Sequence, residues 1–205
     1  PILDFTVFKP TAIASTQILK KVSSNESLDE REKILYDKSL DRFDKICHLA
    51  FKMDVRVLVD AEESWIQDAI DEIVLSMMMK YNKEKAIVYN TSQMYRHDRL
   101  NYLKTLHDEA LRNNFFIGIK LVRGAYIEKE NKRAKRNNYL SPICRSKELT
   151  DQNFNNGASY ILSNLNKFSL FSGTHNEGSI YKIINIMEKN NINKDNANIW
   201  FGQLY

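Results

Sequence analysis

Residues 115–125 read FFIGIKLVRGA, a nearly unbroken apolar run that ends in a lysine, an arginine and a glycine. Such a run, rich in β-forming residues and without regular polar alternation, is typical of a strand buried on both faces of a parallel sheet. Five further segments have the same character: FTVFKPTAIA (5–14), VRVLVDA (55–61), AIVYNT (86–91), FSLFSGTH (168–175) and NIWFGQLY (198–205). The sequence therefore predicts six buried strands.

Segments with apolar residues at helical spacing separate these strands. They are 27–54, 64–81, 92–114, 149–167 and 176–191. Ser27, with Glu30 three residues later, is a possible N-cap of the first helix. The run KENKRAKR (129–136) predicts a solvated helix face, with Glu130 and Arg133 as an ordinary pair on it. Strict alternation of strands and helices implies parallel strands joined by right-handed crossovers.

Two architectures have this alternation, an open doubly wound sheet and a (β/α)8 barrel. The glycine fingerprints of nucleotide-binding doubly wound sheets follow none of the strands. Polar residues lie late in the strands or just beyond them, and in a barrel such positions converge on one mouth. They are Lys9, Asp60, Asn90, Lys120, Arg123, His175, Asn176 and Gln203. We therefore predict an α/β fold, a (β/α)8 TIM-type barrel with about six of the eight units present, as one incomplete domain over residues 1–205.

Composition argues against several classes of protein. The formal net charge of +4 is spread over 205 residues without a basic stripe, so nucleic-acid binding is not expected. Cys47 and Cys144 form no CxxC motif and the four histidines have no ligand spacing, which argues against a disulfide framework or a metal site. No apolar run approaches the roughly 20 residues of a membrane span. The abrupt start and end suggest that both lie inside a larger domain.

Charged residues at two predicted strand ends are candidates for chemistry. Asp60 directly follows an apolar strand, where an ionised carboxylate requires a cationic or hydrogen-bonding partner. Glu62 and Glu63 are interpreted instead as charges that favour the first turn of the next helix. Lys120 and Arg123 suggest a cradle for a pyrophosphate or an anionic ring edge. Composition alone equally allows a snorkelling lysine and an arginine in a helix-side salt bridge.

A third group follows the fifth predicted strand. Thr174, His175 and Asn176 carry hydrogen-bonding side chains suited to a cofactor phosphate or ribose, although a lone histidine is more often structural. Tyr126, after the glycine of the fourth strand, is either a stacking surface or a core residue.

Seven segments together resemble the proline dehydrogenase family, in order and across essentially the whole chain. They are FTVFKPTAIAS, LVDAEES, VYNTSQMYRHDRL, IKLVRGAYIEKE, TDQNFN, GTHNE and WFGQLY. The resemblance implies a (β/α)8 barrel that holds FAD at the carboxyl ends of its strands, with L-proline against the flavin. It also implies hydride transfer to FAD, which gives Δ1-pyrroline-5-carboxylate, and then electron transfer to a membrane quinone.

The resemblance carries roles over by position. It implies Asp60 and Lys120 as catalytic residues and Lys9 and Tyr126 as substrate-binding residues, with no metal. The FAD contacts that it implies are Asn90, Lys120, Val122, Arg123, Gly124, Ala125, Thr150, Thr174, His175, Asn176, Gln203 and Leu204. The chain departs from the family at Asn90, where many members have Gln, and at Lys120, where many have Arg.

The family's last two strands and its final helix, with a Tyr-x-x-Arg-Arg motif, have no counterpart in the 205 residues. We therefore expect these residues alone to be inactive. The resemblance further implies a cytoplasmic protein in peripheral contact with the inner face of a membrane, the mitochondrial inner membrane in a eukaryote. Two alternatives stay open: a Schiff-base aldolase that uses Lys9 or Lys120 as nucleophile, and a non-catalytic truncated barrel.

Overall fold

The computed structural model describes residues 3–203, which contain a single six-stranded sheet. Its strands are β1 (Phe5–Phe8), β2 (Arg56–Val59), β3 (Val88–Gln93), β4 (Ile117–Val122), β5 (Phe168–Gly173) and β6 (Ile199–Gly202). Neighbours in the sheet follow the order of the chain, and every pairing is parallel. The predicted six parallel strands are confirmed.

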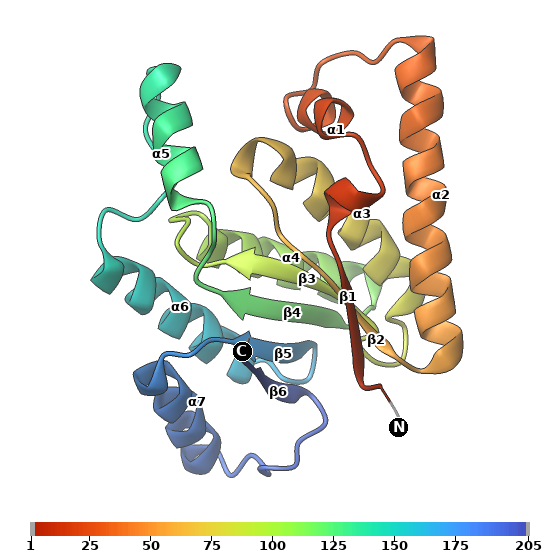
Figure 1. Ribbon diagram of the computed structural model, residues 1–205. Helices are drawn as coiled ribbons and strands as arrows, with labels where there is room; N and C mark the ends of the chain where they lie inside the picture. The colour runs from red at the N-terminus through yellow and green to blue at the C-terminus, as the bar shows by residue number, and fades with distance from the viewer. Residues whose placement is uncertain (1–2, 204–205) are drawn as a thin grey trace.

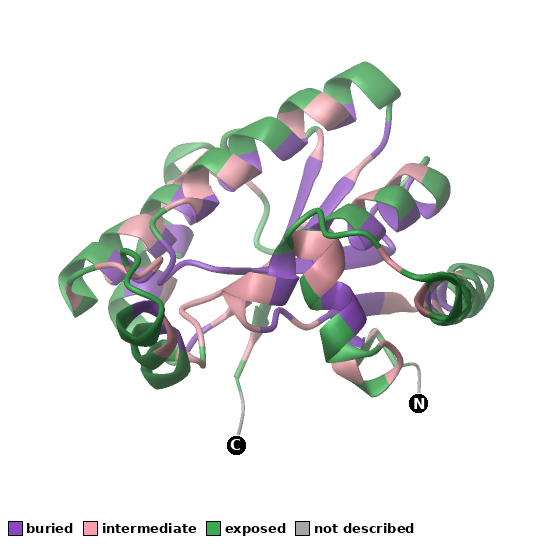
Figure 2. Ribbon diagram, turned by 90° about the horizontal axis from the view of Figure 1, so that it is seen from above, coloured by how far each residue is buried: buried purple, intermediate pink, exposed green. Residues whose placement is uncertain are grey.

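Most of the helices lie along the outer side of this sheet, whereas α5 (Ile127–Arg136) extends away from it beyond the end of β4 (Figure 1). The other α-helices are α1 (Thr16–Ser23), α2 (Glu30–Met53), α3 (Ser64–Tyr81), α4 (Arg99–Asn113), α6 (Lys147–Leu162) and α7 (Glu177–Lys189). Along the chain, both α5 and α6 come between β4 and β5. Buried residues follow the strands and the inner sides of the helices, whereas the outer sides of the helices are exposed (Figure 2).

Alternation along each strand divides the core into two parts. Val59, Ile119, Leu170 and Ile199 share one row across the sheet and pack into the core beneath the helices. The adjacent row faces the other side, where Leu58 and Tyr89 contact the rings of Phe5 and Phe171. Because side chains alternate strictly between faces, a residue's position in the register decides which part of the core it enters.

The inner side chains show that the sheet is curled. The Phe5 ring on β1 lies 5.0 Å from that of Phe171 and 4.9 Å from that of Trp200 on β6, measured between centroids. The Arg56 guanidinium lies 4.7 Å from the centroid of the same Trp200 ring. First and last strands therefore approach each other across an aromatic interior. The sheet is a curled half-barrel of six parallel strands, which agrees with the expected six of eight units, and closure into a full eight-unit barrel stays a prediction.

The sequence misplaced some element boundaries. The segment predicted as one strand over 5–14 leaves the sheet after Phe8 and forms a 3-10 turn at Pro10–Ala12, followed by α1. The first long helix is capped by Asp29 rather than Ser27. Asp29 Oδ1 accepts from the backbone N–H of Glu32, whose carboxylate accepts from the Asp29 N–H in return. This reciprocal pair satisfies two of the N–H groups that a helix start leaves free.

Candidate active site

Three charged side chains meet where the strands end. Lys120 Nζ on β4 donates to Asp60 Oδ1, which follows β2, over 2.6 Å. Lys9 Nζ, just after β1, lies 3.5 Å from the other carboxylate oxygen of Asp60. The lysine side chains are unequally exposed, 55% for Lys9 and 16% for Lys120. The Asp60 carboxylate therefore pairs with an exposed lysine, Lys9, and a largely buried one, Lys120, at the carboxyl ends of the strands, which form the mouth of the curled sheet.

Groups around Lys9 stabilise its charged form. Burial by itself lowers the pKa of Lys9, but Tyr126, Asp60 and Glu62 together outweigh this effect and raise the pKa above its ordinary value. Lys9 is thus a cation at neutral pH, suited to binding a carboxylate.

A cavity of about 380 Å³ opens over this cluster. Strand-end residues from β1 to β5 line it: Lys9, Asp60, Ala61, Thr91, Gln93, Lys120, Val122, Arg123, Gly124, Ala125, Tyr126, Gly173, Thr174 and His175. A second cavity of about 300 Å³ shares Lys120, Val122, Gly173, Thr174 and His175, and extends to Gly202 on β6 and to Gln203 just after it. The structure thus brings together most of the residues that the sequence nominated.

Arg123 ties β4 to the two elements beside it. Its Nε donates to Asp151 Oδ1 over 2.6 Å, Nη1 to Thr174 Oγ1 over 2.6 Å, and Nη2 to Ser179 Oγ over 3.0 Å. The guanidinium also lies 4.7 Å from the centroid of the Phe154 ring. Hydrogen bonds from Lys147 and, less strongly, from Arg123 hold the pKa of Asp151 below its ordinary value. Arg123 therefore shapes the wall of the cavity as well as adding a positive charge.

Gly124 turns the chain sharply at the end of β4. Its φ of 132° is one that side-chain-bearing residues rarely adopt, and a Cβ here would lie 2.6 Å from the Tyr95 ring. Only glycine fits, which brings bare backbone to the cavity wall.

The segment after β5 is held partly by its own hydrogen bonds. Thr174 Oγ1 accepts from the Asn176 N–H, and Asn176 Oδ1 accepts from the Ser179 N–H as the N-cap of α7. His175 is exposed and lines both cavities. Of the three predicted residues, Thr174 and His175 face the cavity and Asn176 caps a helix.

Gln93, rather than the predicted Asn90, is a β3 residue that lines the cavity. Asn90 lies in the helix-facing row, and its Nδ2 donates to Asp71 Oδ1 and to the Tyr102 hydroxyl, both over 2.8 Å. Its side chain is fully buried there, so the predicted side-chain contact with a ligand at the mouth is wrong. Thr91 and Gln93, in the alternate row, line the cavity instead. Gln93 Nε2 donates to the Glu62 carbonyl over 2.7 Å, and its Oε1 accepts from the Ala125 N–H.

Thr150 and Leu204 are the two remaining predicted contacts. Thr150 is buried in the first turn of α6, and its hydroxyl donates to the Ser146 carbonyl, so it does not line either cavity. Leu204 lies outside the described residues.

Acidic residues near the start of α3 also differ from the prediction. Glu62 lies before the helix and is 4% exposed. Glu130 is fully buried, and its carboxylate accepts from both the backbone N–H and the hydroxyl of Ser64, each over 2.6 Å. It therefore satisfies the start of α3. Arg133 lies over the Trp65 ring at 4.5 Å rather than pairing with Glu130.

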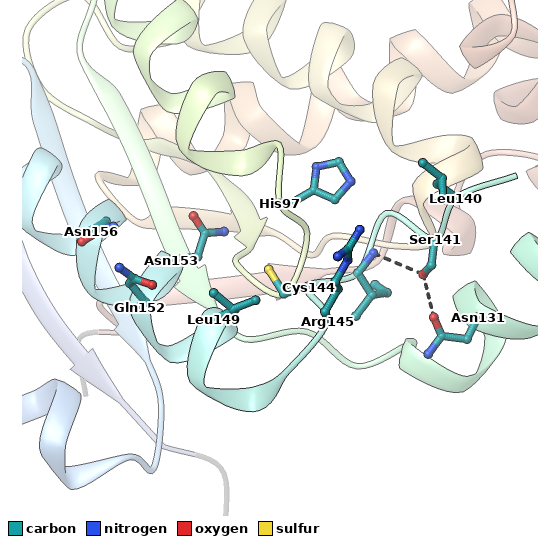
Figure 3. A pocket seen from close by; sticks show the side chains of 11 residues that line it. His97, Asn131, Leu140, Ser141, Cys144, Arg145, Leu149, Gln152, Asn153 and Asn156 are labelled. Carbon is teal, nitrogen blue, oxygen red and sulfur yellow. Dashed lines mark hydrogen bonds between the residues drawn. The ribbon is translucent and has the colours of Figure 1, made fainter.

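A larger pocket of about 940 Å³ lies beside the mouth, between the loop before α4, the loop before α6, and α6 itself (Figure 3). Its lining residues are His97, Asn131, Leu140, Ser141, Ile143, Cys144, Arg145, Leu149, Gln152, Asn153 and Asn156. None of the sequence-predicted site residues is among them. Size alone favours this pocket, but the paired charges converge at the mouth, and we take the mouth as the candidate site.

Within residues 3–203, no group of three or more His, Cys, Asp or Glu side chains is arranged to hold a metal ion. No helix in the same range is long and apolar enough to cross a membrane.

Comparison with known proteins gives a consistent family. Residues 6–205 match the family model described as proline dehydrogenase. The carbapenem antibiotics biosynthesis protein CarD of Pectobacterium carotovorum is 34% identical over 99% of this chain and 52% of its own length. Proline dehydrogenase 1, mitochondrial, of Drosophila melanogaster is 35% identical over 85% of this chain and 27% of its own. Hydroxyproline dehydrogenase of Xenopus laevis is 32% identical, over 90% and 40%.

Among solved structures, proline utilization A (PutA) from Bdellovibrio bacteriovorus superimposes with a TM-score of 0.84. At 23% identity, over 97% of this chain and 20% of the other, this likeness supports the fold alone. The chain spans about half the length, or less, of the relatives that it matches. From the family model and these relatives, the chain belongs to the proline dehydrogenase family.

Proposed function

We propose that this chain forms the cofactor- and substrate-binding part of an enzyme that oxidises L-proline to Δ1-pyrroline-5-carboxylate with FAD. The observation that carries the proposal is the cluster of Lys9, Asp60 and Lys120 beside Tyr126, at the strand ends of a proline dehydrogenase family member. We further propose that the full-length protein is a complete (β/α)8 barrel. Enzymes with this fold build their active sites at the carboxyl ends of the strands.

The residues at the mouth fit a flavin dinucleotide. The two adjoining cavities share five residues along β4 and β5, which gives an elongated site of the size that cofactors occupy. Arg123 supplies a cation, and Gly124 and Gly173 leave backbone open to a ligand. Lys120 stands beside them, with its side chain held in place by the ion pair to Asp60. Charge-assisted donors and bare backbone are the groups that bind phosphates and anionic ring edges.

We assign the cofactor contacts to these strand ends. From β3 to β6 they are Gln93, Lys120, Val122, Arg123, Gly124, Ala125, Thr174, His175 and Gln203, with Asn176 at the start of α7 and Thr150 in the first turn of α6 supporting them. Leu204, which lies outside the described residues, is proposed from the family resemblance alone. FAD, when bound, supplies the hydride acceptor, and the protein supplies binding, orientation and electrostatics.

The residues of this chain would orient the substrate. Lys9 pairs with the proline carboxylate, and Asp60 keeps both Lys9 and Lys120 in place. Tyr126 packs against the ring from the β4 side of the cavity. Oxidation removes a hydride from the ring carbon next to nitrogen and a proton from the nitrogen, leaving a C=N bond. An uncharged amine releases hydride more readily, so turnover rises with pH over the neutral range.

The aldolase alternative is disfavoured by the surroundings of both lysines. A Schiff-base lysine is activated by an apolar pocket or a neighbouring cation that lowers its pKa. The pKa of Lys9 is raised instead, because Tyr126, Asp60 and Glu62 outweigh burial. Lys120 is in direct ion pairing with Asp60. The non-catalytic alternative is disfavoured because the polar strand-end residues still converge on one cavity.

We also propose a quinone as the electron acceptor, reached through peripheral contact with the inner face of a membrane. Several relatives are named as mitochondrial, which supports the mitochondrial inner membrane if the protein is eukaryotic.

Product formation tests the proposed reaction. Full-length protein is incubated with FAD, an artificial electron acceptor and L-proline, and the cyclic imine is trapped and identified by mass. We expect product from L-proline and none from D-proline, with hydroxyproline as a second substrate to compare. Consumption of L-proline into any product other than the imine, or the absence of consumption by flavin-loaded protein, contradicts the proposal.

A further inference from the structure

Glu62 occupies a buried position between β2 and α3, two residues after Asp60. Its side chain is almost completely removed from solvent, and it lies outside the helix that its sequence suggested. Burying an ionised carboxylate is costly unless hydrogen bonds compensate. The partners of Glu62 are therefore informative about its role.

One carboxylate oxygen holds the turn that follows Lys9. Glu62 Oε1 accepts from the backbone N–H of Thr11 over 3.1 Å and from the Thr11 hydroxyl over 2.6 Å. Thr11 belongs to the 3-10 turn that begins directly after Lys9. The two hydrogen bonds that this oxygen accepts fix the backbone directly after Lys9, and so the position from which the Lys9 side chain extends.

The other oxygen holds Tyr126, which lies next to Lys9 in the same cavity. Glu62 Oε2 accepts from the Tyr126 hydroxyl over 3.2 Å. Burial, and next the charge of Glu62, raise the pKa of Tyr126, so the phenol keeps its proton for this bond. The backbone of Glu62 is fixed as well: its N–H donates to Gln67 Oε1, and its carbonyl accepts from Gln93.

We propose that Glu62 is a positioning residue that holds Lys9 and Tyr126, which lie next to each other in the cavity, in fixed positions for substrate binding. The inference rests on the proposed function, because Lys9 and Tyr126 are its substrate-binding residues. A carboxylate suits this place because its two oxygens accept from two loops at once, one after β1 and one after β4.

Two substitutions separate the two contacts. Glu62→Ala removes both, and we expect the KM for L-proline to rise about tenfold, the size of effect that losing one or two net hydrogen bonds produces. In Glu62→Gln the amide oxygen still accepts from Thr11, but the amide nitrogen can only donate, so Tyr126 loses its charged acceptor and its hydroxyl has to turn to accept. We expect its KM to rise about threefold. In both variants, bound flavin per protein stays near one and kcat falls less than KM rises.

A double-mutant cycle tests whether Glu62 acts on the KM through the Tyr126 hydroxyl. Tyr126→Phe removes the hydroxyl that Glu62 accepts from, so adding Glu62→Gln to Tyr126→Phe should change KM no further. Glu130→Gln is the matched control, since Glu130 is also a buried carboxylate beside α3 but, among residues 3–203, its carboxylate accepts hydrogen bonds only from Ser64. It should lower the Tm and leave the KM unchanged.

All variants are made in the full-length protein and compared with the wild type. If the wild type turns over L-proline and Glu62→Gln lowers the Tm with KM unchanged, the inference is wrong and the proposed function stands. Additive effects of Glu62→Gln and Tyr126→Phe also overturn it. A wild-type protein without activity on L-proline overturns the proposed function itself. If Glu62→Ala does not fold, Glu62→Gln and the cycle still decide the question.

Discussion

Lys120 and Asp60 are separated by 60 residues in the chain, yet Lys120 Nζ lies 2.6 Å from Asp60 Oδ1. The two side chains reach each other across the inner side of the sheet, from β4 and from the loop after β2, with Thr91 of β3 paired in register with Lys120. Lys9 approaches the second oxygen of the same carboxylate. The electrostatics of the mouth therefore depend on Asp60.

Removal of this carboxylate should impair activity more than stability. In Asp60→Ala, two lysines face the cavity without their shared counter-ion, and we expect kcat/KM for L-proline to fall about 10- to 100-fold, as for the loss of charged hydrogen bonds. The Tm should change by only a few degrees. Steady-state kinetics and thermal unfolding of full-length protein check both values. A large drop in Tm with full activity of the remaining folded protein would make Asp60 a structural residue.

Gly124 should tolerate no side chain. Gly124→Ala places a Cβ 2.6 Å from the Tyr95 ring at a φ of 132°, so we expect lower stability and lower flavin content. Gly178→Ala is the control, because a Cβ there comes no closer than 3.4 Å to the Asn176 side chain and the residue lies in α7. Absorbance spectra after dialysis, with Tm values, compare the two. Equal behaviour of both variants would be inconsistent with the close approach.

Arg123 should contribute to both flavin binding and the local fold. Arg123→Ala removes the hydrogen bonds to Asp151, Thr174 and Ser179, and we expect loss of most bound flavin after extensive dialysis. Lys147→Ala removes only an exposed partner of Asp151 and should retain its flavin. Unchanged flavin content in Arg123→Ala would exclude a cofactor contact at this position.

Asp98 should stabilise the fold in a pH-dependent way. Burial opposes its ionisation, but hydrogen bonds from Arg99 and Arg96 outweigh burial and hold the pKa of Asp98 well below its ordinary value. A lowered carboxyl pKa contributes stability above the unfolded pKa of about 3.9 and loses it progressively as the pH falls further.

We therefore expect Asp98→Asn to lower the free energy of unfolding at pH 6, and the difference from wild type to shrink between pH 5 and pH 3. Asp108→Asn, at an exposed position on the same helix, should change the free energy by less than about 0.5 kcal/mol. Urea unfolding at a series of pH values measures both. If the difference in free energy of unfolding between wild type and Asp98→Asn stays constant down to pH 3, the ion pairs of Asp98 with Arg96 and Arg99 are not its cause.

The sequence predicted the strands and their charged ends because both are local features. The apolar run before Asp60 identifies a buried strand, and a charge directly after it is placed at the strand end wherever the strand lies. Lys120 was found in the same way. The turn after Phe8 was missed because the apolar residues of 5–14 continue through it.

Asn90 and Glu62 show what local pattern could not give. β3 runs two residues past the predicted end, to Gln93, and alternation then sends Asn90 to the helix side and Thr91 and Gln93 to the mouth. Lys120 faces the mouth, and Thr91 and Gln93 share its side of the sheet. A polar glutamine two residues after Thr91, at the end of the same strand, is the local signal that would have found Gln93. The local sequence assigns Glu62 to the start of a helix, because its partners, Thr11 and Tyr126, are 51 and 64 residues away in the chain.

The most direct test of the central claim is the visible spectrum of the full-length protein, recorded without oxygen before and after L-proline is added. We predict a flavin absorbance that L-proline bleaches and that a quinone analogue restores, with Lys9→Ala requiring much higher L-proline for the same bleaching. A protein that binds FAD but keeps its full flavin absorbance at saturating L-proline would contradict the assignment of this mouth to proline oxidation.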